Sequence, residues 1–83
     1  MSGLKELIEV RVVRLGRPID DYDGWRANVR APEVGDHGHI VDVLHAKDQP
    51  DRYVVECTLP DGTDLWLSEF DAEELEPVAE SAA

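Results

Sequence analysis

Two histidines in the middle of the chain are spaced as metal ligands often are. His37 and His39 stand one residue apart in Asp36-His37-Gly38-His39, so both imidazoles lie on the same side of an extended strand. Zinc sites use three or four protein ligands, and no third ligand is evident nearby. We therefore predict no metal and no cofactor, although the sequence alone leaves metal binding by this pair open.

The run Asp20-Asp21-Tyr22-Asp23-Gly24 is the second candidate for metal chemistry, because clustered carboxylates bind calcium. It lacks the first ligand of the spaced acidic pattern and the glutamate that closes a calcium loop. A solvated acidic loop is the better interpretation.

Nucleophilic catalysis would require Cys57 or a serine beside a base. Cys57 falls on the apolar face of a β-type segment, where a thiol behaves as a small hydrophobic group. The chain holds nineteen acidic residues, so neighbouring carboxylates carry little information about acid-base catalysis, and no phosphate-binding glycine motif is present. We predict no catalytic residues and no enzymatic activity.

The two tryptophans are candidates for protein recognition. If Leu65 and Leu67 face the core, strict alternation leaves Trp66 on the surface, where an indole is a typical interface anchor. Alternatively, Trp66 covers one end of the domain. Trp25, close to the acidic run, is open to the same two interpretations, contact with a partner or hydrophobic closure of the barrel.

Charge is unevenly distributed along the 83 residues, whose formal net charge is −11. Residues 1–30 hold six basic and five acidic side chains, whereas residues 31–83 hold two basic and fourteen acidic ones. Such a field repels nucleic acid and anionic lipid and attracts basic protein surfaces, or it serves only solubility. With no secretory segment and no long apolar run, the sequence predicts a cytoplasmic protein.

The elements that would position these residues are short strands in one domain spanning residues 1–83, with an ordered core over about 4–78 and a tail at 79–83. Alternating and β-branched patterns, separated by turn residues, predict four strands and a long loop after the first strand. The predicted elements are strands at 8–15, 39–46, 52–59 and 63–67, a loop over 19–35, a polar loop at 47–51, a helical turn at 71–75 and a last short strand at 76–78. The predicted core consists of Val10, Val12, Ile40, Val55, Cys57, Leu65, Leu67, Phe70 and Leu75.

A family resemblance adds to this pattern over about residues 8 to 78. The segments that carry it are Val34-Gly35-Asp36-His37-Gly38-His39-Ile40-Val41-Asp42-Val43, Tyr53-Val54-Val55-Glu56-Cys57, Pro60-Asp61-Gly62-Thr63, Leu65-Trp66-Leu67 and Glu73-Glu74-Leu75-Glu76-Pro77-Val78. Together they resemble small bacterial SH3-like proteins, similar members of which occur among antitoxin and toxin-immunity proteins. The resemblance implies an all-β, SH3-like barrel of about five strands, with a helical turn before the last.

Acidity and resemblance together predict a protein-binding module, an immunity or antitoxin-type inhibitor that occludes a basic toxin enzyme. The alternative is an adaptor, chaperone or accessory subunit of an enzyme assembly. The candidate partner-binding residues are Asp20, Asp21, Asp23, Trp25, Asp64 and Trp66. We expect a basic protein partner, no nucleic acid and no membrane, with the chain a monomer in the complex and a homodimer possible.

Overall fold

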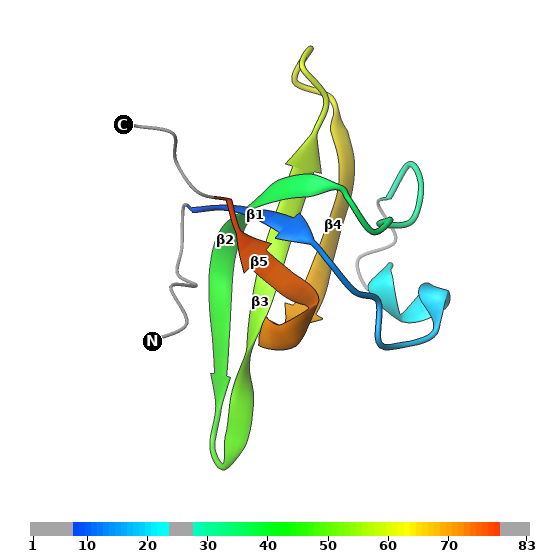
Figure 1. The fold of residues 1–83 in the computed structure, drawn as a ribbon. Coiled ribbons are helices and arrows are strands. Elements are labelled where there is room, and N and C mark those ends of the chain that lie inside the picture. The colour runs from blue at the N-terminus through cyan, green and yellow to red at the C-terminus, as the bar shows by residue number, and fades with distance from the viewer. Residues whose placement is uncertain (1–7, 24–27, 79–83) are drawn as a thin grey trace.

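The protein is mainly β, with five antiparallel strands in one sheet (Figure 1). The computed structural model describes residues 8–23 and 28–78. The strand order across the sheet is β4-β3-β2-β1-β5. The strands are β1 (Glu9–Val12), β2 (His37–Ala46), β3 (Gln49–Thr58), β4 (Asp64–Asp71) and β5 (Leu75–Pro77). The predicted all-β class is confirmed.

Two 3-10 turns lie in the connections between strands. The first, η1 (Ile19–Tyr22), lies in the long connection between β1 and β2, and the second, η2 (Ala72–Glu74), joins β4 to β5. This arrangement, with a long loop after the first strand and a helical turn before the last, is the one predicted for an SH3-like barrel. The two turns bring the long loop and the end of β4 together, because Tyr22 of η1 bonds to Glu74 of η2.

The core fills one face of the sheet and follows the two-residue period of the strands. It is closed by Tyr22 from η1 and Leu75 from β5, both fully or nearly fully buried. The buried cluster comprises Val10, Val12, Tyr22, Ile40, Tyr53, Val55, Cys57, Trp66, Phe70 and Leu75. Seven of the nine predicted core residues therefore belong to it, and the exceptions are Leu65 and Leu67.

The alternation predicted for β4 is wrong by one residue. Trp66, Ser68 and Phe70 are buried, and they alternate with side chains that keep partial exposure. Leu65 packs against the core only in part, and Leu67 lies on the opposite face. Because β4 extends to Asp71 rather than ending at 67, Phe70 shares the face of Trp66, and the largest aromatic pair sets the orientation of the strand.

Several strand boundaries also differ from the prediction. β1 ends at Val12 rather than at residue 15, and the polar loop predicted at 47–51 is a two-residue connection between β2 and β3. Asp48 in this connection has a positive φ of 62°, a conformation that aspartate tolerates and that tight hairpins require. The pairing of β2 with β3 extends to Ala46 and Gln49, with a register shift after Leu44, and the hairpin is longer than expected.

Gly38 permits close packing where β2 passes the neighbouring strand. A Cβ atom at this position would lie 2.7 Å from the Glu56 carbonyl oxygen and 2.7 Å from Val55 Cγ1. No side chain fits there without moving the β3 backbone. The glycine of the sequence Asp36-His37-Gly38 is therefore needed for strand packing, a role that does not depend on metal binding by the flanking histidines.

Cys57 is buried opposite Trp66 in the β3 and β4 pairing. Burial raises the pKa of its thiol, and the carboxylate of Asp36 adds to this effect. We expect a thiol reagent to label the native protein much more slowly than the urea-unfolded protein, because the reactive thiolate is both scarce and covered. Cys57→Ala should cost on the order of 1 kcal/mol of stability. Native labelling at the unfolded rate would contradict this prediction.

Candidate partner-binding surface

The long loop between β1 and β2 carries most of the candidate residues, and two carboxylates hold it in place. Glu74 of η2 fixes its first part, and Asp36 fixes its last part. Both side chains reach residues that lie far away in the sequence. The geometry of the loop therefore depends on the whole domain.

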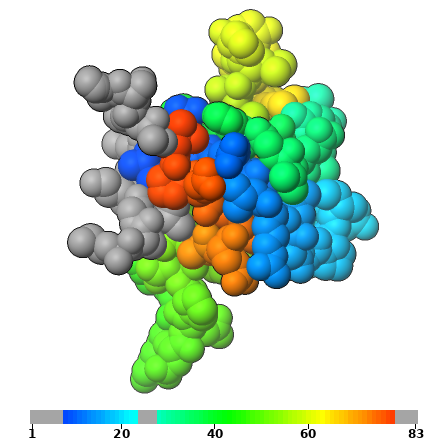
Figure 2. All heavy atoms as spheres, in the orientation of Figure 1, coloured from blue at the N-terminus to red at the C-terminus, as the bar shows by residue number. Residues whose placement is uncertain are grey.

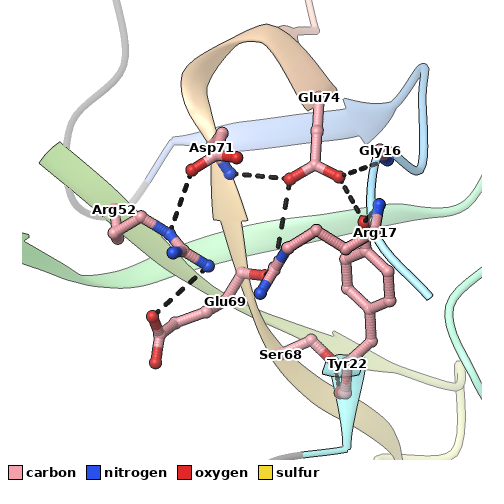
Figure 3. Close-up of polar contacts among 8 residues, drawn as sticks. All are labelled: Gly16, Arg17, Tyr22, Arg52, Ser68, Glu69, Asp71 and Glu74. Carbon is pink, nitrogen blue, oxygen red and sulfur yellow. Dashed lines mark hydrogen bonds and ion pairs between the residues drawn. The ribbon is translucent and has the colours of Figure 1, made fainter. Parts of the chain in front are cut away.

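Glu74 is a buried carboxylate with a full set of donors (Figure 3). Its Oε1 accepts the N–H of Asp71 at 2.8 Å, and its Oε2 accepts the N–H of Gly16 at 2.8 Å and the hydroxyl of Tyr22. The guanidinium of Arg17 lies 4.0 Å away. Burial alone would raise the pKa of Glu74, but these hydrogen bonds and the Arg17 charge outweigh it and hold the pKa below its usual value.

The residues around Glu74 fasten the loop to the end of β4. Arg17 lies 4.6 Å above the ring of Tyr22 and donates to the carbonyl of Glu69. The hydroxyl of Ser68 donates to the carbonyl of Tyr22. Burial and the contact with Glu74 raise the pKa of the Tyr22 phenol. Tyr22 thus anchors the acidic run to the core, a role that the sequence analysis did not assign to it.

Asp36 forms the second attachment. Arg30 donates to both carboxylate oxygens, at 2.9 and 3.0 Å, and the indole N–H of Trp66 donates at 2.9 Å. The N–H of Glu33 adds a further bond at 2.9 Å. Burial works against ionisation of Asp36, but these bonds and the Arg30 charge prevail, and the pKa lies below its usual value. The buried indole is thereby tied to the end of the loop.

An open hollow of about 580 Å³ lies on the outer side of this loop. We call it the acidic hollow, and its lining residues are Ile19, Asp20, Asp23, Asn28, Val29, Arg30 and Ala31. Its two carboxylates are exposed. Apolar groups stand beside them, since Ile19 is 49% and Val29 70% exposed. Asp23 also accepts the N–H of Asn28 at 3.4 Å. Exposed aliphatic side chains next to exposed acids form a surface suited to a basic, partly apolar protein segment.

Only part of the predicted site comes together. Asp20 and Asp23 line the hollow, and Asp21 is exposed between them on η1. Asp64 is exposed at the start of β4 and does not line the hollow, although the carbonyl of its neighbour Leu65 accepts the N–H of Val29 at 2.8 Å. Trp25 lies outside the described residues.

The prediction that Trp66 is an exposed anchor is wrong, because the indole is 1% exposed. The other interpretation, closure of the domain, is the one the structure bears out. The exposed apolar residues that line the hollow are instead Ile19 and Val29. The sequence carried a signal for them, namely aliphatic residues inside a polar loop where no strand or helix buries them.

The two histidines of the candidate metal pair are exposed on β2. His37 Nδ1 lies 3.0 Å from Glu9 Oε2, and His39 stands opposite Glu9 in the β1 ladder. Across residues 8–23 and 28–78, no three histidine, cysteine or acidic side chains are close enough together to hold a metal ion. The same residues contain no helix of the length and apolarity needed to cross a membrane.

Comparisons with protein-family models, curated proteins and solved structures give no match. The resemblance to small bacterial SH3-like proteins therefore stays a prediction about family, while the five-strand architecture stands on the structure itself.

Proposed function

We propose that this chain is a non-catalytic protein-binding module whose acidic hollow binds a basic protein, as an immunity or antitoxin-type inhibitor binds a toxin enzyme. The observation that carries the proposal is the pairing pattern of the loop. Arg17 and Arg30 are engaged with the protein's own carboxylates, whereas among the described residues no basic side chain pairs with Asp20, Asp21 or Asp23. Two arginines of the loop are thus neutralised within the protein, while its acidic run has no basic partner among the residues that the structure describes.

The neighbouring apolar groups give this surface a second component. Opposite charge mainly accelerates encounter and sets its salt dependence, whereas desolvated apolar contacts mainly slow dissociation. Asp20 and Asp23 supply the first, and Ile19 and Val29 supply the second. A toxin that acts on nucleic acid would suit this surface, because its basic substrate-binding groups could pair with the carboxylates.

Charge reversal in the hollow tests the proposal. We expect Asp20→Lys and Asp23→Lys each to weaken the complex about tenfold, mainly through slower association. Glu73→Lys is the matched control, because Glu73 is exposed on η2 and does not line the hollow, yet its replacement changes the net charge equally. The partner is first captured from native cells on the wild-type protein, and binding kinetics are then measured with the purified pair at two salt concentrations.

The apolar half of the surface is tested in the same experiment. Val29→Ser should leave the association rate nearly unchanged and speed dissociation. If the captured protein binds Asp20→Lys, Asp23→Lys and Val29→Ser as tightly as wild type, or binds Glu73→Lys as weakly as the other two lysine variants, the hollow is not the binding surface. If the chain retains nucleic acid instead of a protein, the proposed class of function is wrong.

A further inference from the structure

Among the residues that the structure describes, the second half of β2 is paired on one side only. Residues 41–46 pair with β3 on one side. On the other side, the pairing with β1 ends where Glu9 faces His39 and the Ile40 N–H donates to the Ile8 carbonyl. In the part of the chain that the structure describes, no strand lies along the edge of residues 41–46 (Figure 1). An open edge presents unpaired N–H and C=O groups that can add another strand.

The edge of the sheet formed by β4, in contrast, is occupied by other parts of the chain. The outer edge of β4 is covered by the long loop: Val29 donates to the Leu65 carbonyl, the Asn28 side chain accepts the Leu67 N–H at 2.9 Å, and Arg17 donates to the Glu69 carbonyl. Three contacts therefore satisfy the β4 edge within the chain. Along the second half of β2, in contrast, no strand of the described part of the chain occupies the edge.

Apolar side chains accompany the open edge. Val41 is 40% exposed and Leu44 is 37% exposed. The hairpin that carries them projects from the body of the protein (Figure 2). Backbone pairing together with apolar side-chain contact is the usual basis of strand addition.

Charge indicates what occupies the edge. Residues 41–52 carry three acidic and two basic side chains, although the whole chain has a net charge of −11. The hairpin is thus the region where two copies of this acidic protein can approach with little mutual repulsion. A basic partner, in contrast, would be drawn to the strongly acidic surfaces elsewhere.

We propose that residues 41–46 of β2 pair antiparallel with the same residues of a second copy, related by a two-fold axis. Such an interface is isologous, so one strand supplies both halves. Pairing of six residues buries little surface, which makes the dimer weak and concentration-dependent. The surface is separate from the acidic hollow, so the proposal stands or falls independently of the proposed function.

Asp42 restrains this association. Its carboxylate accepts the N–H of Val43 at 2.9 Å, which occupies a backbone donor of the β2 strand, and charged edge residues discourage strand addition. Replacement of Asp42 should therefore tighten the dimer, whereas a charge at Leu44 should disrupt it. Two substitutions on one strand with opposite effects distinguish edge pairing from nonspecific association.

Sedimentation velocity from micromolar to millimolar concentration tests the proposal. We expect reversible dimerisation of the wild type, about tenfold weaker dimerisation for Leu44→Lys, and several-fold tighter dimerisation for Asp42→Ala. Leu59→Lys is the matched control and should dimerise like wild type, because Leu59 is 41% exposed on the other hairpin. Thermal unfolding followed by circular dichroism verifies that each variant is folded.

Three results would overturn it. The first is a wild-type protein that stays monomeric at millimolar concentration. If a variant without residues 1–7 then dimerises, the edge belongs to the chain's own N-terminal segment. The second is equal loss of dimer in Leu44→Lys and Leu59→Lys. The third is a monomeric wild type whose complex with a captured partner is lost in Leu44→Lys alone, which would assign the edge to that partner.

Discussion

Trp66→Ala is expected to remove a large share of the stability of the domain rather than merely to weaken a complex. The indole is 1% exposed, packs edge-on against Phe70 with 5.6 Å between ring centroids, and donates to Asp36. Truncation of a large buried aromatic costs about 3 to 5 kcal/mol. Because a small domain has a total stability of only about 5 to 15 kcal/mol, this loss removes a large share of it.

Urea unfolding followed by circular dichroism measures this loss. Trp66→Phe retains an aromatic ring in the core but leaves Asp36 without the indole donor, so it should cost less than the alanine variant. Leu67→Ala, on the half-exposed face of the same strand, is the matched truncation and should cost less still. A Trp66→Ala protein that is as stable as wild type but binds its partner weakly would restore Trp66 as a surface anchor.

The error in the orientation of β4 shows how far local patterns reach. The segment Leu65-Trp66-Leu67 alone is compatible with either orientation of the strand. Hydrophobicity favours the orientation that buries two leucines over the one that buries a single tryptophan. The decision comes from Phe70, which shares the parity of Trp66 once the strand is known to continue. Ser68, a polar residue at a core position, hides this continuation, and its burial is explained only by its bond to the Tyr22 carbonyl.

The contacts that attach the loop to the domain could not be predicted from the sequence either, because they join residues that are far apart in the chain. Tyr22 and Glu74 are 52 residues apart, and Asp36 and Trp66 are 30 apart. Among nineteen acidic residues, the local pattern indicates only the capping bond between Asp71 and Glu74, and it does not show that Glu74 and Asp36 also bind donors far away in the sequence. The strands, the hairpin turn at Asp61-Gly62 and most of the core could be predicted, because they depend on periodicity and turn chemistry between neighbours.

These attachments also explain how a loop rich in aspartate keeps a defined shape. Repulsion among Asp20, Asp21 and Asp23 favours an extended, solvated segment. Tyr22 in their midst is buried and bonded to Glu74, and the far end of the loop is held by Asp36 and Arg30. The described residues that line the acidic hollow are therefore preorganised, which would reduce the entropy lost on binding of the proposed partner.

Glu74→Gln should consequently be the most damaging conservative substitution in the chain, with an expected cost of about 3 kcal/mol. The amide keeps the size of the side chain but removes the charge opposite Arg17, and its NH₂ group cannot accept the bonds that the carboxylate receives from Gly16, Tyr22 or Asp71. Glu73→Gln makes the same change at an exposed position on the same turn. It should alter stability by less than about 0.5 kcal/mol.

The pH dependence of the difference in stability between wild type and Glu74→Gln tests whether the charge of the Glu74 carboxylate is its source. The pKa of Glu74 in the folded protein lies below its usual value of 4.5, so the unfolded chain takes up the proton more readily than the native state. The contribution of Glu74 is therefore complete above about pH 4.5 and is lost as the pH falls through the folded pKa. The stability difference between wild type and Glu74→Gln should be constant near neutral pH and shrink in that acidic window, since Asp36 is present in both proteins and cancels. Urea unfolding of the two proteins from neutral to acidic pH measures this stability difference. A difference that does not change with pH would mean that the glutamine destabilises through packing, and that the charge of Glu74 does not hold the loop.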